Sequence, residues 1–206
     1  MKTDRYQSVR ELMARAIICV LFTLLSVNLL HGYLQTGHVT GLLLLVSEFL
    51  VVVLTFVRRP AHLVDRSAGA ALITLVSAFS PLLLRVSDGA GLLPDAATAG
   101  LLALGVIVVV MGKLTLGRSF GLVPANRGVV VAGPYAFVRH PIYTGYLVTH
   151  IAFLLAHPVF WNVVLVAISD TALIIRALVE ERVLDHDAHY RAYCQRVGWH
   201  FVPGLF

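Results

Sequence analysis

The chain has 206 residues, of which 58% are hydrophobic and only 13% are charged. A soluble domain carries about 25% charged residues, so this composition excludes an ordinary soluble protein and predicts one membrane domain. The net charge of +5 does not indicate nucleic acid as a partner, because the basic residues stand at the ends of apolar segments, where topology signals lie.

Six apolar segments follow one another along the chain. About 20 helical residues cross a bilayer core of about 30 Å, which predicts an all-α, polytopic membrane bundle. The predicted spans are residues 16–34, 41–57, 68–86, 97–116, 142–156 and 159–178. The fifth span is short, and the His157-Pro158 pair after it favours a turn, so we expect the last two spans to form a helical hairpin.

The basic residues are distributed unequally between the two ends of these spans. They precede the first span, separate the second from the third and the fourth from the fifth, and follow the sixth, whereas only Arg85 falls on the other side. Positive residues favour the cytoplasmic side, so both termini are predicted to be cytoplasmic. Residues 117–140 and the tail after Glu180 then share that face, and we expect the polar chemistry there.

A polar cluster, residues 133–145, leads into the fifth span. Its centre reads Arg139-His140-Pro141-Ile142-Tyr143, and proline suits the first turn of a helix. The free N–H groups and positive dipole of that helix start suit an anionic ligand group. An interfacial anchor made by Arg139 and Tyr143 would explain the same residues equally well.

A second polar group closes the last apolar segment. Arg176 and Glu180 are four residues apart and therefore share one face of a helix. They are either a solvated ion pair or a site for a ligand that carries both a carboxylate and an ammonium group.

Several short motifs occur in a characteristic order. They are Gly133-Pro134-Tyr135, the segment from Arg139 to Gly145, Arg176, Glu180-Glu181, Leu184, Tyr190 and Tyr193. In this order they resemble the isoprenylcysteine carboxyl methyltransferase family, which forms a wider group with the phospholipid N-methyltransferases. The resemblance covers roughly residues 114–203. It divides the chain into N-terminal membrane spans, residues 1–113, and a methyltransferase core, residues 114–206.

The resemblance implies a membrane methyltransferase that uses S-adenosylmethionine, bound in a cytosolic pocket at the last two spans. It assigns Arg176 and Arg139 to the catalytic centre, with Arg176 facing a carboxylate of the substrate. The implied cofactor-binding residues are Arg127, Gly128, Val129, Val130, Tyr135, His140, Pro141, Ile142, Tyr143, Glu180 and Glu181. Carboxylates suit the amine or ribose of the cofactor, and aromatic faces suit its adenine and sulfonium.

The methyl acceptor is expected to be lipophilic and to enter laterally from the bilayer. A carboxylate of an isoprenylcysteine-like, prenylated substrate is the first choice, because Arg176 could bind it. Such a carboxylate is already ionised at neutral pH, so its methylation needs no general base. The alternative acceptors are a phospholipid amine, a thiol or another lipophilic metabolite. An amine or thiol would require a base such as Glu181 or His140.

Two other classes of membrane protein are less favoured. A sterol-type reductase would need a nicotinamide phosphate site, and no pattern specifically suggests one. A small transporter predicts a polar stripe through several spans, whereas the polar residues here gather at one face.

Glu48 and Asp170 lie inside apolar spans, where a charge costs at least ~2.5–3.5 kcal/mol. They are contacts of a substrate tunnel, part of a proton path, or protonated or hydrogen-bonded packing contacts. His150 is predicted to pair with Asp170 across the hairpin. No metal site is expected. His186 and His189 are more consistent with a solvated helix, because so local a cluster lacks an enforced geometry.

Overall fold

The computed structural model describes residues 39–85, 87 and 89–205, together with isolated positions between 12 and 34. The chain divides into two compact units, Met1–Arg58 and Arg59–Phe206. The first predicted span lies largely outside the described residues, and so does the side chain of Glu48. The functional boundary between residues 113 and 114 stays a prediction.

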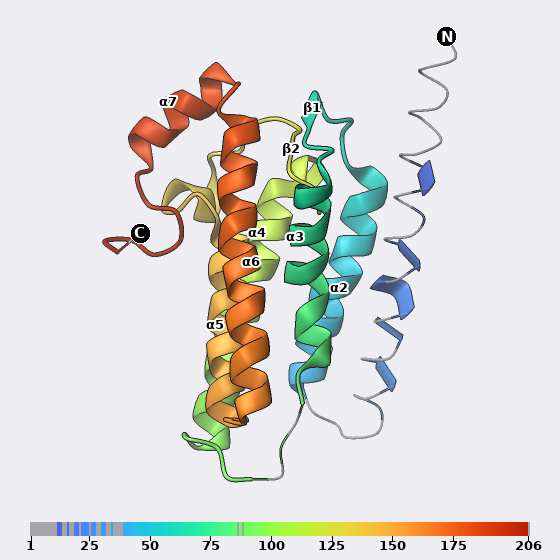
Figure 1. Cartoon of the computed structure of the whole chain (residues 1–206), viewed down its shortest axis with the longest axis vertical. Helices are drawn as coiled ribbons and strands as arrows, with labels where there is room; N and C mark the ends of the chain where they lie inside the picture. The colour runs from blue at the N-terminus through green and yellow to red at the C-terminus, as the bar shows by residue number, and fades with distance from the viewer. Residues whose placement is uncertain are drawn as a thin grey trace. The chain divides into compact units, whose positions relative to one another are not determined.

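The described part is mostly helical, as predicted. The first unit contains α2 (Val39–Val57). The second unit contains α3 (Ala68–Phe79), α4 (Asp95–Leu116), α5 (Pro141–Ala156), α6 (Phe160–Leu184) and α7 (Ala188–Arg196), shown in Figure 1. Its short strands β1 (Leu63–Val64) and β2 (Ala125–Asn126) pair antiparallel.

Two of the described helical segments, Asp95–Ser119 and Phe160–Leu184, are long and apolar enough to cross a membrane. The 25 residues of α6 extend about 38 Å, which exceeds the thickness of the hydrocarbon core. The apolar helices α3 and α5 are shorter. Six spans and cytoplasmic termini therefore stay predictions.

Two predicted helix ends were wrong. The α-helix that was expected over residues 68–86 ends at Phe79, because Pro81 lacks an N–H donor and the chain continues as a 3-10 turn, Ser80–Leu83. The helix of the sixth predicted span, α6, instead continues past residue 178 to Leu184. Charged residues there are good helix formers, and Val183 is buried, so polarity alone did not end the helix.

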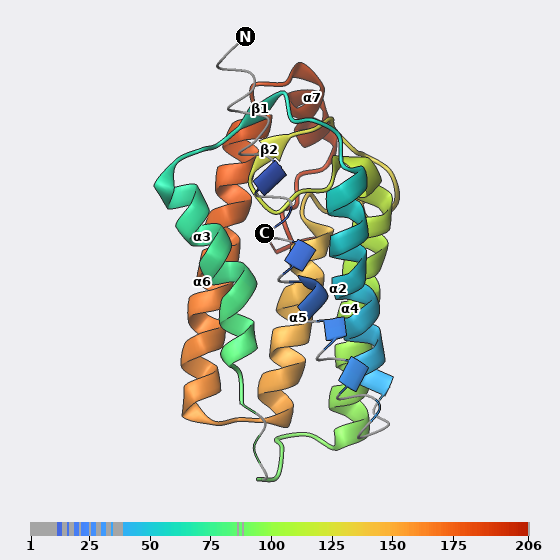
Figure 2. The same ribbon diagram turned by 90° about the vertical axis from the view of Figure 1, so that its right-hand side faces the viewer.

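Within the second unit, α4 packs along α5, and α3 packs along α6 (Figure 2). The α4–α5 contact depends on glycine. A Cβ atom at Gly145 would lie 2.7 Å from the Gly105 carbonyl oxygen, and one at Gly105 would lie 2.9 Å from the Gly145 carbonyl oxygen. Small residues allow helix backbones to approach closely in membranes, so α4 holds the start of α5 in place.

The predicted clamp across the helical hairpin is confirmed. His150 Nδ1 of α5 lies 2.5 Å from Asp170 Oδ1 of α6. The turn between these helices follows His157, whose carbonyl accepts a hydrogen bond from the Val159 N–H at 2.9 Å. The pair joins two apolar helices that lead to the same polar end of the unit.

Candidate active site

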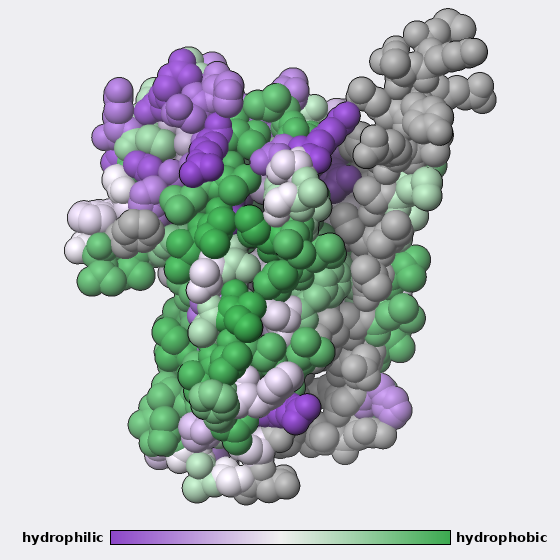
Figure 3. All heavy atoms as spheres, in the orientation of Figure 1, coloured by the Kyte–Doolittle hydropathy of each residue, from purple (hydrophilic) through white to green (hydrophobic). Residues whose placement is uncertain are grey.

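A cavity opens at the polar end of the second unit, where the loop after α4 meets the start of α5, the end of α6 and the helix α7. The space inside it is about 850 Å³ when the open solvent at its mouth is counted. Figure 3 shows hydrophilic residues gathered over α7 and the adjoining end of α6, with hydrophobic residues below them. The cavity therefore adjoins both polar and apolar surface.

Most residues that the sequence analysis assigned to the site line this one cavity. They are Arg127, Gly128, Val129, Val130, Tyr135, Arg139, His140, Ile142, Tyr143, Arg176 and Glu180. Two assigned residues do not line it: Pro141 is fully buried in the first turn of α5, and Glu181 is directed to the neighbouring tail. The cavity thus brings together residues from four separate segments.

Other lining residues were missed by the sequence analysis: Leu116, Ser119, Phe120, Gly121, Leu122, Ala125 and Tyr146. Tyr146 follows Tyr143 by three residues, so helical spacing from the predicted wall would have found it. Residues 120–124 form an irregular loop before β2, and no sequence period indicates which side chains of this stretch face inward.

Arg176 is a buried cation in the wall of the cavity, only 6% exposed. It donates from Nη1 to Ser77 Oγ at 3.4 Å and from Nη2 to the Leu122 carbonyl, while its Nε has no hydrogen-bond partner. No described carboxylate forms an ion pair with it, so the solvated Arg176–Glu180 pair is not observed. A buried charge is costly unless it is paired, so the position of Arg176 suits an anionic group, and its role in the site stays a prediction.

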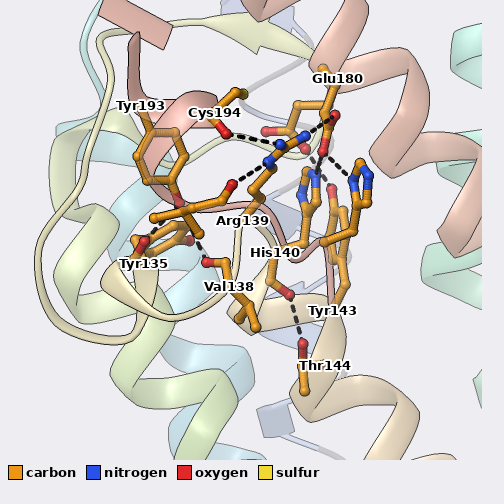
Figure 4. Close-up of polar contacts among 12 residues, drawn as sticks. Tyr135, Val138, Arg139, His140, Tyr143, Thr144, Glu180, Tyr193 and Cys194 are labelled. Atoms are coloured by element: carbon orange, nitrogen blue, oxygen red, sulfur yellow. Dashed lines mark hydrogen bonds and ion pairs between the residues drawn. The ribbon is translucent and has the colours of Figure 1, made fainter. Parts of the chain in front are cut away.

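Glu180 and two aromatic side chains form the adjoining wall (Figure 4). The Tyr143 hydroxyl donates to Glu180 Oε2 at 2.8 Å. The His140 ring stacks on Tyr143, with 5.3 Å between ring centroids and 3° between planes. A carboxylate beside flat rings suits a ligand that carries a cationic group and an aromatic base.

Glu181 lies behind this wall, at the centre of a polar cluster. Its Oε1 is 2.8 Å from His140 Nε2 and 2.7 Å from His200 Nδ1. Its Oε2 accepts from Arg139 Nη1 at 3.2 Å. Adjacent glutamates of one helix thus have different surroundings, because successive residues point about 100° apart.

Arg139 joins the start of α5 to the C-terminal tail. Its Nε donates to the Val197 carbonyl at 2.8 Å and its Nη2 to the Cys194 carbonyl at 3.2 Å. Its backbone N–H also donates to the Trp199 carbonyl at 2.9 Å. Its guanidinium therefore positions the tail, and a direct catalytic role for Arg139 stays a prediction.

Backbone N–H groups at the start of α5 are bonded or packed within the protein. The His140 N–H donates to the His200 carbonyl at 2.9 Å. The Ile142 nitrogen faces α4, since a Cβ at Gly112 would lie 3.3 Å from it. These backbone N–H groups are therefore less available to an anion than the position of the helix start predicted. The arginines of the cavity are better placed to bind an anionic group.

Tyrosines of α7 close the side of the cavity. The Tyr193 hydroxyl donates to the Tyr135 carbonyl at 2.7 Å, and the Tyr190 and Tyr193 rings lie 5.8 Å apart. Burial raises the pKa of Tyr193 and that of Tyr135, so both phenols are neutral at pH 7. Asn126 Nδ2 donates to Asp187 Oδ2 at 3.1 Å, which ties the loop to the start of α7.

The histidines that the sequence analysis considered for metal do not form a metal-type group within the described residues. His189 has a side chain 91% exposed, and His186 bonds to backbone carbonyls. A different group, His140, Glu181 and His200, has its potential ligand atoms within 4.8 Å of one another.

The part of the chain that carries this cavity matches a known family. Residues 95–191 match the model of the phospholipid methyltransferase family. No curated protein matches the chain. The matched segment runs from the first residue of α4 into α7, and it does not show the finer resemblance to the isoprenylcysteine carboxyl methyltransferase family.

Methyltransferases of the phospholipid methyltransferase family use S-adenosylmethionine. The residues of the cavity fit its chemistry. The cofactor carries an amine, a carboxylate, a sulfonium and an adenine, and the cavity offers the Glu180 carboxylate, the Arg176 and Arg127 guanidinium groups and tyrosine rings. The family match and the apolar helices favour a membrane methyltransferase, and they do not fix its acceptor.

Proposed function

We propose that the protein methylates the amine of a lipophilic acceptor, with a phospholipid headgroup as the preferred class. One observation carries the proposal: Arg176 and Glu180 place opposite charges in one cavity at the polar end of apolar helices. A phospholipid with an amine headgroup has a phosphate close to that amine, so a cationic receptor beside the reacting atom suits it.

The residues of the cavity have separate tasks in this proposal. Glu180 binds the amine of the cofactor, and the Tyr143 hydroxyl orients that carboxylate at 2.8 Å. Tyr135 and Tyr143 supply aromatic faces, and Arg127 binds the cofactor carboxylate. The cofactor supplies an activated methyl group on a sulfonium, so the protein acts by in-line positioning and exclusion of water.

Arg176 is assigned to the anionic group of the acceptor. The same residue supports a second candidate, the carboxylate of an isoprenylcysteine-like substrate, because guanidinium groups bind carboxylate and phosphate alike. The family match favours the phospholipid class, whereas the buried Arg176 serves either acceptor.

The cavity is proposed to face the cytoplasm, in a protein of six spans with both termini on that side. The support is the excess of basic residues at this end of the spans. An acceptor dissolved in the bilayer would then reach the cavity laterally, with its headgroup at the interface.

Two measurements on the purified protein in detergent micelles test the proposal. Calorimetric titration with S-adenosylmethionine and with its demethylated product should show binding of both. Transfer of a labelled methyl group should then proceed to a phospholipid with a primary amine headgroup and more slowly to an S-prenylated cysteine. Folded protein that binds neither cofactor form removes the methyltransferase assignment, and transfer only to the prenylated carboxylate removes the amine proposal.

A further inference from the structure

We infer that His140 is the general base that removes a proton from the acceptor amine, and that Glu181 is the residue that positions it. This inference rests on the proposed amine acceptor. An amine is protonated at neutral pH and cannot attack a methyl group in that form, so the reaction requires a base within the cavity.

The geometry distinguishes His140 from Glu181 as the base. His140 lines the cavity, whereas Glu181 does not. The His140 ring is held from two sides, by the stacked Tyr143 ring and by Phe201, whose ring centroid lies 5.6 Å away. Glu181 is thus placed to act on the acceptor only through the imidazole.

The hydrogen bond between these residues sets the tautomer of His140. Glu181 Oε1 lies 2.8 Å from His140 Nε2, so that nitrogen carries the hydrogen. The other ring nitrogen, Nδ1, then has a free lone pair, and it makes no hydrogen bond with any residue that the structure describes. A carboxylate–imidazole pair of this kind orients the base and stabilises the imidazolium that forms.

Two further residues hold Glu181. His200 Nδ1 contacts the same Oε1 at 2.7 Å, and Arg139 Nη1 donates to Oε2 at 3.2 Å. Arg139 stands at the start of α5 and His200 in the C-terminal tail, and backbone hydrogen bonds join these two segments. The tail must therefore be docked for Glu181 to be held by both residues. Side-chain exposure rises from 7% at His140 to 15% at Glu181 and 22% at His200. Among the three side chains of this cluster, His140 is therefore the most enclosed.

The proton and electron balance closes without a further reactant. The ammonium N–H proton passes to His140 Nδ1, the freed nitrogen lone pair forms the new N–C bond, and the C–S bond breaks with its electrons going to sulfur. The imidazolium later releases its proton to water. The net reaction therefore releases one proton per methyl group transferred.

A metal ion held by the same three side chains is the competing interpretation. Zinc bonds of about 2.0–2.1 Å would separate tetrahedral ligand atoms by about 3.3 Å. The two nitrogen–oxygen distances of 2.7 and 2.8 Å are instead hydrogen-bond lengths. The Arg139 guanidinium on Glu181 adds a positive charge that disfavours a second cation.

The test is the pH dependence of kcat with the amine phospholipid in micelles. The charged or titratable groups around His140 are Arg139, Tyr143, Glu180, Glu181 and His200. In the wild type, kcat should rise with pH as neutral His140 forms. His140→Gln should lower kcat, measured at saturating S-adenosylmethionine, by about 100-fold or more and abolish this rise.

Variants of the two supporting residues should shift the rise in opposite directions. Glu181→Gln removes the anion that favours the imidazolium, so the rise should move to lower pH and its plateau should fall. His200→Ala removes a donor from Glu181, leaves that carboxylate a stronger partner for His140 and should move the rise to higher pH. A merely structural disturbance does not produce opposite shifts. His189→Gln, at an exposed histidine outside the cavity, is the control and should match the wild type.

The outcomes separate this inference from the proposed function. A wild type that does not methylate the amine refutes the proposed function before any variant is compared. A wild type that methylates it, with unchanged kcat and pH profile in His140→Gln or with equal shifts in Glu181→Gln and His200→Ala, refutes the role of His140. One tightly bound metal ion per chain, with activity lost on its removal and restored on its return, would also overturn it.

Discussion

Replacing Glu180 with glutamine should weaken the binding of S-adenosylmethionine without unfolding the protein. The amide oxygen of glutamine still accepts the Tyr143 hydroxyl, which the native carboxylate holds at 2.8 Å. The change therefore removes the negative charge and retains the local packing. The thermal midpoint should stay close to that of the wild type, because no buried donor loses its acceptor.

The size of the effect follows from the interaction that is lost. A hydrogen bond to a charged group contributes about 1.5–3 kcal/mol. At about 1.4 kcal/mol for each factor of ten, Kd should rise by about 10- to 150-fold. Glu180→Ala should give at least this loss, together with a lower thermal midpoint, since it also deprives Tyr143 of its acceptor.

The assay is calorimetric titration in detergent micelles, with circular dichroism to confirm the helical content. Asp185→Asn is the matched control, because this exposed carboxylate at the end of α6 lies outside the cavity. An unchanged Kd in folded Glu180→Gln protein would refute the role of Glu180 in binding the cofactor amine. An equal loss of affinity in the control would assign the effect to general surface charge.

Three further changes test other parts of the second unit. Arg176→Ala should raise the apparent KM of the acceptor by about tenfold or more in a methyl-transfer assay, and calorimetry should show a nearly unchanged cofactor Kd. A lower cofactor affinity would instead place the cofactor carboxylate at this residue. Gly121→Val should displace Arg127, because the Arg127 Nη1 would lie 2.3 Å from the new Cβ. Calorimetry should then show weaker cofactor binding, and an unchanged cofactor Kd would contradict the role given to Arg127. Asp170→Asn weakens the contact with His150 and should lower the free energy of unfolding by about 0.6–1.7 kcal/mol in detergent unfolding experiments; equal stability would show that the clamp contributes nothing.

The hairpin and its clamp show what local sequence patterns predict well. The apolar runs of α5 and α6 and the His157-Pro158 turn between them are local features of the sequence, and the structure has them together with the contact of His150 and Asp170. The end of α3 was predicted wrongly because the sequence stays apolar past Pro81, whereas the α-helical hydrogen bonding of the backbone ends at Phe79.

The different contacts of the adjacent Glu180 and Glu181 could not be predicted from the sequence. Family resemblance assigned both to the cofactor, but the turn of the helix directs one carboxylate to Tyr143 and the other to the tail. No local pattern brings His200 to Glu181, because that contact requires the tail to fold back along the start of α5.

The sequence by itself determined the membrane class, the apolar helices and the polar segments that face one end of them. Hydropathy and helical spacing depend on residues that are close along the chain, so both can be recognised from the sequence alone. Only the tertiary structure decided that Arg176 is a buried cation without a carboxylate partner among the residues the structure describes, and that His140 meets a glutamate 41 residues further along the chain. Such contacts depend on how distant helices pack and on where the tail returns, and these are collective properties of the fold.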